Sequence, residues 1–239
     1  MKTMVEPQPD FPGKRASARP AKPKPQDLPD RLRPIAEHLQ PPTTMKDLNR
    51  AMAACRACPL WRDATQAVAG EGPIDGPLLA LVGEQPGDQE DLTGQVFVGP
   101  AGKVLRRALA AAGIEADEIF LTNAVKHFKH EQSDKRRLHK RPKRGEVEIC
   151  RWWVRYELEL VKPKLVVTLG VTALQSLSAH KGPLSAVRNA TIKTREGRMM
   201  RATIDPSALL RLPDEADEEA EFKRFVADLK TAKKLALAA

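Results

Sequence analysis

The chain has 239 residues, 41% of them apolar and 30% charged, which predicts one folded domain with a tail and excludes a wholly disordered protein. Its net charge of +9 at pH 7 favours nucleic acid as a partner over a membrane surface, since no apolar run approaches the roughly 20 residues of a spanning helix. Three cysteines, two of them spaced C-x-x-C, and the lack of a secretory leader argue for a metal or redox site in a reducing compartment, and we expect a cytoplasmic, nucleoid-associated protein.

The amino-terminal stretch has the composition of an unfolded arm. Residues 1–45 hold ten of the twenty prolines, scattered among Lys, Arg and Gln. Such a stretch lacks the apolar surface that would offset the entropy of folding, so we expect a disordered Pro/Lys-rich arm, with a short helical turn over residues 32–39. A solvated tail and a DNA-gripping arm both fit this composition. The folded domain is expected over residues 46–239.

The first cysteines follow a helical pattern that begins at Lys46. Cys55 and Cys58 are separated by two residues and followed by Pro59. Two thiolates at this spacing can bind one metal centre, because the intervening turn points both sulfurs the same way. A thioredoxin-type redox pair is the alternative, and it is disfavoured because no strand precedes the pair.

A buried strand is predicted over residues 78–82, and it leads into the glycine-bounded segment Gly83-Glu84-Gln85-Pro86-Gly87. We expect the loop to continue through Asp88, Asp91 and Phe97 as far as Gly102. A parallel α/β sheet places its ligand site at the carboxyl end of such a strand. The segment is not a phosphate-binding P-loop, because no Gly-Lys-Ser/Thr follows at the right distance.

Strands and helices alternate along the rest of the chain. We predict strands over residues 119–122, 165–169 and 199–204, helices over 103–112, 144–161, 172–177 and 218–235, and a turn at Asp205-Pro206-Ser207. This alternation predicts an α/β fold, a three-layer sandwich with a central, mostly parallel sheet covered by helices on both faces.

The stretch from residue 123 to residue 150 combines charge with candidate ligands. It holds three of the five histidines and one of the three cysteines, and residues 135–144 include seven Lys/Arg and no acid. Such a run cannot pack into a core, because burying unpaired cations is too costly, so it faces solvent or a polyanion. His139 lies inside the run, and the candidate metal ligands His127 and Cys150 flank it. The stretch therefore predicts a functional loop fixed at both ends.

The sequence resembles a known family. The motifs GEQPGDQED, FVGPAGK, TNAVKHFKH, KRRLHKRP and DPSALLR, over roughly residues 52–229, resemble the uracil-DNA glycosylase superfamily, its iron-sulfur family 4 and, within it, the UdgX-like proteins. The resemblance implies the glycosylase fold with an iron-sulfur cluster at one side, and a monomer that acts on uracil-containing DNA, preferably single-stranded. In UdgX-like proteins a basic loop like KRRLHK carries a histidine that attaches covalently to the sugar after uracil is removed. The resemblance thus implies a single-turnover hydrolase of N-glycosyl bonds that cross-links through His139.

The residues can be tested against this chemistry. Cleavage of the bond between base and sugar builds positive charge on the sugar and negative charge on the base, in a site that holds a flipped-out nucleotide. Glu84 and Asp88 can stabilise the sugar, Phe97 can stack on the base, and Asn123 can read the uracil edge through its amide. Core packing for Phe97 and a strand-end cap for Asn123 are the alternatives. The resemblance adds backbone amides around Gln85 that hold uracil oxygens, and the other substrate-binding candidates are Gly83, Arg137 and Ser207.

His139 has a specific expected role. An imidazole attacks only when it is neutral, and neighbouring cations disfavour its protonated form by like-charge repulsion. These cations are Arg136, Arg137, Lys140 and Arg141. On residue type alone, a phosphate contact or a bystander is the alternative for this histidine.

The four candidate metal ligands are Cys55, Cys58, His127 and Cys150. Three cysteines and one histidine would equally make a structural zinc site. The resemblance, and not the spacing, favours a 4Fe-4S iron-sulfur cluster with a structural role, anchoring the basic loop.

One motif departs from the family. The superfamily's His-Pro-Ser is replaced here by Asp205-Pro206-Ser207, and we expect Asp205 at a catalytic position. A deprotonated carboxylate cannot donate a hydrogen bond and would repel the uracil anion. Three functions therefore compete: a uracil-excising, DNA-cross-linking enzyme; a catalytically weakened glycosylase fold that binds uracil-containing or single-stranded DNA; and a zinc-stabilised nucleic-acid-binding module without base chemistry.

Overall fold

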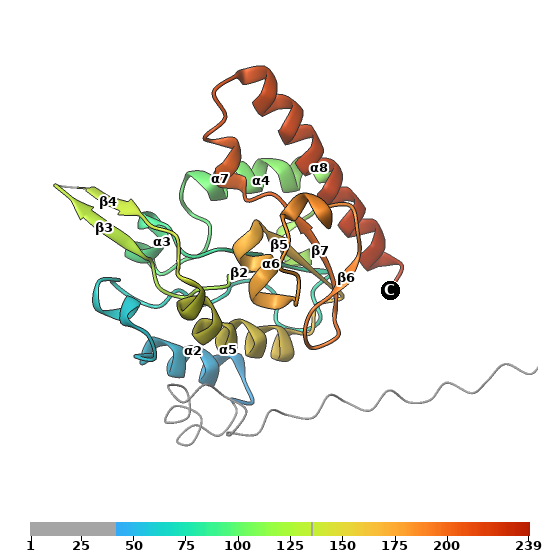
Figure 1. The fold of residues 1–239 in the computed structure, drawn as a ribbon. Helices are drawn as coiled ribbons and strands as arrows, with labels where there is room; N and C mark the ends of the chain where they lie inside the picture. Colours follow the sequence, from blue (N-terminus) through green and yellow to red (C-terminus); the bar gives the residue numbers. More distant parts are fainter. Residues whose placement is uncertain (1–41, 135) are drawn as a thin grey trace, which may run out of the picture.

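The fold is built around a five-stranded sheet of order β2-β1-β5-β7-β6. The computed structural model describes residues 42–134 and 136–239 (Figure 1). The helical turn expected over residues 32–39 and most of the expected arm therefore lie outside the described residues. The strands of the sheet are β1 (Leu79–Gly83), β2 (Ile119–Asn123), β5 (Leu165–Leu169), β6 (Ile192–Lys193) and β7 (Met199–Thr203). Only β6 runs antiparallel to its neighbour, so the predicted mostly parallel sheet is confirmed.

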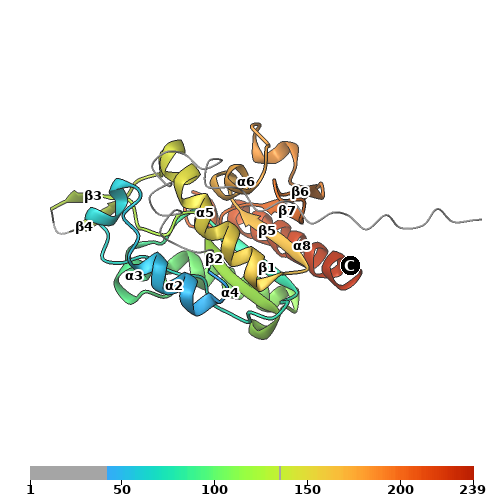
Figure 2. The same cartoon turned by 90° about the horizontal axis from the view of Figure 1, so that it is seen from below.

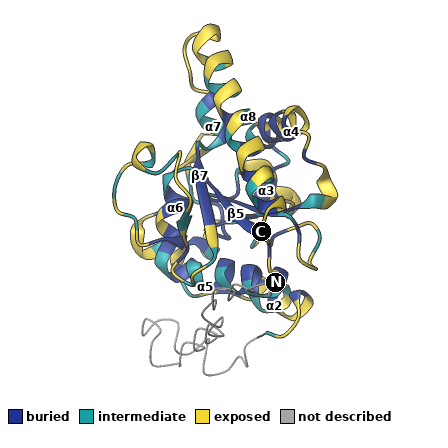
Figure 3. Cartoon of the chain, turned by 90° about the vertical axis from the view of Figure 1, so that its right-hand side faces the viewer, coloured by how far each residue is buried: buried dark blue, intermediate teal, exposed yellow. Residues whose placement is uncertain are grey.

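Helices cover both faces of the sheet, because its strands are apolar on both sides. Leu79 and Leu81 of β1 face one core, and Ala80 and Val82 face the other. One face packs against α5 (Arg144–Val161) and α6 (Val171–Leu177), with α2 (Met45–Ala53) lying on α5. The other packs against α4 (Pro100–Ala112), α7 (Pro206–Leu209) and α8 (Glu215–Leu237). Figure 2, seen from below, shows α5 in front of the sheet. The strands are buried between the two layers of helices (Figure 3).

Most predicted elements are present, with ends moved by capping residues. The side chain of Asp214 accepts a hydrogen bond from the Ala216 amide, so α8 begins three residues before the predicted start at residue 218. Short 3-10 helices lie at Pro59–Arg62, Ala116–Glu118 and Leu184–Ala186. None of the helices in the described part of the chain is long and apolar enough to span a bilayer.

Two predicted loops contain regular structure. The segment after Gly87 was expected to be irregular, but it forms α3 (Asp88–Thr93), which ends at Gly94 in the left-handed region with φ 78. The basic stretch was also predicted as a loop, but it forms a hairpin of β3 (His130–Ser133) and β4 (Arg136–His139). This hairpin projects from the body of the molecule (Figure 1). The predicted turn after Asp205 is the short helix α7, with Asp205 as its N-cap.

Candidate active site and metal centre

Three predicted substrate-binding residues meet at the carboxyl edge of the sheet. Gly83 ends β1 and is the register partner of Asn123, which ends β2. A Cβ atom placed on Gly83 would lie 2.4 Å from Asn123 Oδ1 and 2.7 Å from Cζ of Phe97. Only glycine therefore allows the amide and the ring to approach the strand end so closely. Asn123 and Phe97 are both largely buried, so their polar and aromatic groups are held in fixed positions.

The backbone of Phe97 has an unusual conformation. Its φ of 52 lies in the left-handed region, which non-glycine residues seldom adopt. The Phe97 carbonyl accepts a 2.7 Å hydrogen bond from Arg106, and a Cβ atom on Gly102 would lie 1.6 Å from that carbonyl oxygen. Strained backbone of this kind persists only where its surroundings hold it, and it is concentrated at functional sites.

A buried carboxylate that sequence reasoning missed holds the loop between β1 and α4. One oxygen of Glu90 accepts a hydrogen bond of 3.0 Å from the Gly87 amide, and the other accepts one of 2.7 Å from the Gly99 amide. The signal was its position three residues after Gly87, where a carboxylate can cap the start of a helix. Glu90 thereby fixes both ends of the segment that carries Phe97.

Glu84 and His139, both predicted to be catalytic, are brought together. Glu84 follows β1 directly, and its Oε1 lies 3.6 Å from Nε2 of His139. The side chain of Glu84 is 19% exposed and that of His139 is 52% exposed, so the pair is open to a ligand. The other oxygen of Glu84 accepts a hydrogen bond from the hydroxyl of Thr172 and lies 3.8 Å from Arg141. Thr172 was not predicted as a site residue, and only its place in the first turn of α6, the helix that follows β5, could have suggested it.

The side chain of Gln85 joins the two ends of the hairpin. Its Nε2 donates to the carbonyl oxygens of Lys129 and Lys140, at 3.2 and 3.1 Å, and its Oε1 accepts from the Lys129 amide at 3.1 Å. This amide group is therefore occupied by protein. The predicted role of Gln85 in substrate binding concerned backbone amides around it, and it stays a prediction.

Arg137 and Asp88, predicted for substrate binding and catalysis, are paired with each other. Arg137 Nε lies 2.6 Å from Asp88 Oδ1, and its Nη1 lies 2.6 Å from an oxygen of the fully buried Asp91. Both oxygens of Asp91 also accept from the Thr65 amide at 3.0 Å. A planar guanidinium suits such a two-carboxylate contact, which fastens β4 to α3.

Asp205 lies beside the end of β5. Its Oδ1 accepts a 2.7 Å hydrogen bond from the Ser207 amide. A Cβ atom placed on Gly170 would lie 3.1 Å from the Cβ atom of Asp205. The hydroxyl of Ser207 accepts from Arg211 at 3.1 Å. His180 lies beyond the carboxyl end of α6, where one of its ring nitrogens is 3.1 Å from the Pro183 carbonyl oxygen.

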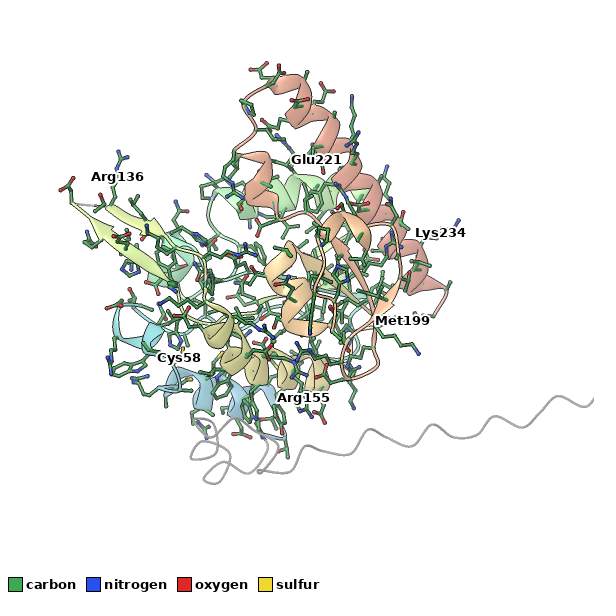
Figure 4. All side chains as sticks on the ribbon, in the orientation of Figure 1. Cys58, Arg136, Arg155, Met199, Glu221 and Lys234 are labelled. Carbon is green, nitrogen blue, oxygen red and sulfur yellow. The ribbon has the colours of Figure 1, made fainter. Side chains whose placement is uncertain are left out.

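The four predicted metal ligands are all buried, and the three cysteines form no disulfide. Burial raises the pKa of the Cys58 and Cys150 thiols, and the neighbouring thiols raise it further. Burial, together with the charge of Arg56, lowers the pKa of His127 to about 4, so its imidazole is neutral at pH 7. The labelled Cys58 lies below the hairpin (Figure 4).

Three thiols and one imidazole are donors for either a zinc ion or an iron-sulfur cluster. Within residues 42–134 and 136–239, no three His, Cys, Asp or Glu gather closely enough to hold one ion. The three thiols are nevertheless near enough for their charges to raise the pKa of Cys58 and Cys150. Cys150 Sγ also accepts a 3.3 Å contact from the Lys126 amide, the kind of hydrogen bond that stabilises a thiolate.

A buried ion pair that the sequence did not predict supports the segment between Asn123 and His127. Lys126 Nζ lies 2.6 Å from Glu157 Oε2, and both side chains are fully buried. The hydroxyl of Thr122 contacts both groups at 2.6 Å, and the other oxygen of Glu157 accepts from the Gly70 amide at 2.9 Å. Buried charges persist only when paired and hydrogen-bonded in this way.

These features define the class: a parallel α/β protein whose carboxylate, amide and aromatic groups converge at the carboxyl edge of the sheet, next to a basic hairpin. Residues 69–230 match the family model described as "Uracil DNA glycosylase superfamily", and the chain belongs to that superfamily.

Relatives make the similarity more specific. The chain is 33% identical over 168 residues to the type-4 uracil-DNA glycosylase of Thermotoga maritima, covering 70% of this chain and 83% of the relative. It is 31% identical over 196 residues to that of Archaeoglobus fulgidus, covering 76% and 92%. It is 34% identical over 128 residues to that of Sulfurisphaera tokodaii, covering 53% and 54%. The predicted relationship to family 4 is confirmed at this level, and the UdgX-like subtype stays a prediction.

Proposed function

We propose that the protein removes uracil from DNA and that His139 then bonds covalently to the sugar. The observation that carries the proposal is the 3.6 Å approach of Glu84 to His139, at the strand end that also holds Asn123. The type-4 relatives support the excision step. The cross-linking step rests on the geometry of the hairpin.

In the first step the bond between C1′ of the sugar and N1 of uracil breaks, and its electron pair leaves with the base. The carboxylate of Glu84 stabilises the positive charge that develops on the sugar. Thr172 and Arg141 hold one oxygen of Glu84, which leaves the other facing His139. The Asn123 amide can accept from the uracil N3 hydrogen and donate to O4, whereas cytosine presents the reverse pattern.

In the second step a ring nitrogen of neutral His139 donates its lone pair to C1′ and forms an N–C bond. The proton on the other ring nitrogen then passes, through the carboxylate of Glu84, to the uracil anion, which leaves as neutral uracil. The attacking ring nitrogen must carry a free lone pair, so the imidazole has to be neutral when it attacks. The protein is consumed in the reaction and turns over once.

A denaturing gel with single-stranded oligonucleotides tests the proposal. Wild-type protein should form a denaturant-resistant adduct with uracil-containing DNA and none with thymine-containing DNA, whose methyl group should not fit. His139→Ala should eliminate the adduct and yield free abasic DNA, because water takes the place of the imidazole. Wild-type protein that yields abasic DNA but no adduct would remove the cross-linking step and leave excision.

The binding-protein alternative rests on one departure from the superfamily's motif, the carboxylate at Asp205. Its Oδ1 caps α7, and a deprotonated carboxylate cannot donate to a uracil oxygen. If this group slows excision, Asp205→His should speed uracil release by about tenfold or more, because it adds a donor where charge develops. Binding of uracil-containing DNA without uracil release, in both the wild type and Asp205→His, would establish the alternative.

We further propose a structural 4Fe-4S cluster held by Cys55, Cys58, His127 and Cys150. When bound, the cluster would tie the residues before and after the hairpin to the loop after α2. Purified protein should be brown and contain iron, whereas a zinc protein is colourless. His127→Ala should lose much of its iron, because removing one ligand opens the site to solvent. Unchanged iron content in that variant would exclude His127 as a ligand.

A further inference from the structure

A second histidine lies beside His139 and has no role in the function proposed above. His130 and His139 are register partners in the β3–β4 hairpin, so their side chains lie on the same face. The adjacent residues Lys129 and Lys140 carry the hydrogen bond, a 2.9 Å contact from the Lys140 amide to the Lys129 carbonyl. His130 and His139 are therefore a non-hydrogen-bonded pair, in which Cα atoms come within about 4.5 Å and side chains are closest.

The ring of His130 stacks on the ring of an aromatic neighbour. Its centroid lies 5.0 Å from that of Phe128 with an interplanar angle of 24°, whereas the His139 ring is 6.2 Å from Phe128 and tilted by 43°. The guanidinium of Arg137 lies 5.5 Å from the centre of the same Phe128 ring. Phe128 is fully buried, so it provides a fixed platform on which the three hairpin side chains are arranged.

One nitrogen of the His130 ring is buried without a hydrogen bond to the described part of the chain. Its Nδ1 is buried, and no hydrogen-bond partner for it is found among the described residues. An unpaired buried nitrogen costs stability, so the folded state alone does not explain a histidine here. The His130 ring lies directly across the hairpin from His139, the side chain proposed to attack the sugar.

We propose that His130 is a positioning residue for His139: its ring, stacked on Phe128, restricts the His139 imidazole to orientations that face Glu84 and the sugar. The inference rests on the proposed cross-linking step. A freely rotating histidine samples three χ1 wells and two ring orientations, so an unrestricted imidazole would be correctly placed about one-sixth of the time. Water would then capture more of the sugar cations.

The test is the fraction of excision events that end in adduct instead of free abasic DNA, measured with full-length protein and a uracil-containing oligonucleotide. His130→Ala should lower the ratio of adduct to free abasic DNA about sixfold, by the rotamer count above. His130→Phe keeps a flat ring and should retain the wild-type ratio. Ser133→Ala, at the exposed end of the same strand, is the matched control, and iron content reports whether each variant is intact.

The outcomes separate the two proposals. A wild type that forms adduct, with an unchanged ratio in His130→Ala, overturns the positioning role alone. A His130→Phe variant as defective as His130→Ala overturns it as well, because a ring would then not suffice. A wild type that releases uracil without any adduct overturns the cross-linking step, and the positioning role with it.

Discussion

The two sides of the site are attached to the protein in different ways. The side that would hold the base is formed by the ends of β1 and β2 and by the strained Phe97, all packed into the core. The side that carries His139 is a hairpin outside the main sheet, fastened by the side chains of Gln85 and Arg137. Recognition of the base and the fate of the sugar can therefore be changed separately, and each of the following variants tests that separation.

The largest effect is expected on the base side, at Gly83. In Gly83→Ala the new methyl group would meet Asn123 Oδ1 at 2.4 Å and Phe97 Cζ at 2.7 Å, so both must move. Displacing groups that orient a substrate by about 1 Å can cost about 100-fold in rate. Uracil release and adduct should fall together, as measured by release of labelled uracil. A loss of adduct with normal uracil release would contradict the separation of the two sides.

The next effect is expected where the hairpin meets α3. Arg137→Ala removes two ion pairs and leaves the buried Asp91 with only the Thr65 amide. Hydrogen bonds to charged groups contribute about 1.5–3 kcal/mol each, so we expect a lower free energy of unfolding in denaturant and about a tenfold loss of adduct. Arg137→Lys keeps the charge but not the planar fork, and should recover little of the adduct. Full recovery in Arg137→Lys would show that charge alone suffices.

A smaller effect is expected at the base of the hairpin. Gln85→Ala removes three hydrogen bonds to the Lys129 and Lys140 backbone, each contributing about 0.5–1.5 kcal/mol, although water can replace some of them. The adduct fraction should fall several-fold while uracil is still released. Gln85→Glu keeps an acceptor for the Lys129 amide but turns a carboxylate oxygen toward the Lys129 and Lys140 carbonyl oxygens, so it should lower the adduct fraction at least as much as Gln85→Ala. Equal adduct fractions in all three proteins would exclude Gln85 from holding the hairpin.

The smallest effect concerns affinity only. Arg136 projects at the end of the hairpin (Figure 4), and Lys143 is exposed between β4 and α5. Replacing both by Ala should weaken binding to any single-stranded DNA and reduce the slope of log affinity against log salt by about 0.7 per lost phosphate contact. Lys234→Ala, on the distant end of α8, is the control. An unchanged slope would mean that neither Arg136 nor Lys143 contacts DNA.

The sheet and most helices could be predicted because their signals are local. Apolar runs such as residues 165–169 and the helical period of residues 144–161 do not depend on distant partners, and both elements have the predicted bounds. The meeting of Glu84 with His139 was predicted through the resemblance. Residue chemistry alone left the histidine as a phosphate contact or a bystander.

What escaped prediction depends on contacts between distant segments. Thr172 reaches Glu84 across 88 positions of sequence, and the buried pair of Lys126 and Glu157 spans 31 positions. The basic stretch was read as irregular because its charge dominates its composition. The stretch forms a hairpin whose two ends are joined by the side chain of Gln85. The sequence of residues 130–139 gives no indication that Gln85 is their partner.

The closed base of the hairpin has a consequence for how this protein could change over time. The Lys140 amide and the Lys129 carbonyl are 2.9 Å apart, so the ten residues between them begin and end at nearly one point. Inserting or deleting chain between adjacent ends adds little loop-closure entropy, and the main cost to a neighbouring element is the loss of the Arg137 contacts with α3. The segment that carries His139 can thus be gained, lengthened or lost in one step, with the sheet and the base-binding side left intact.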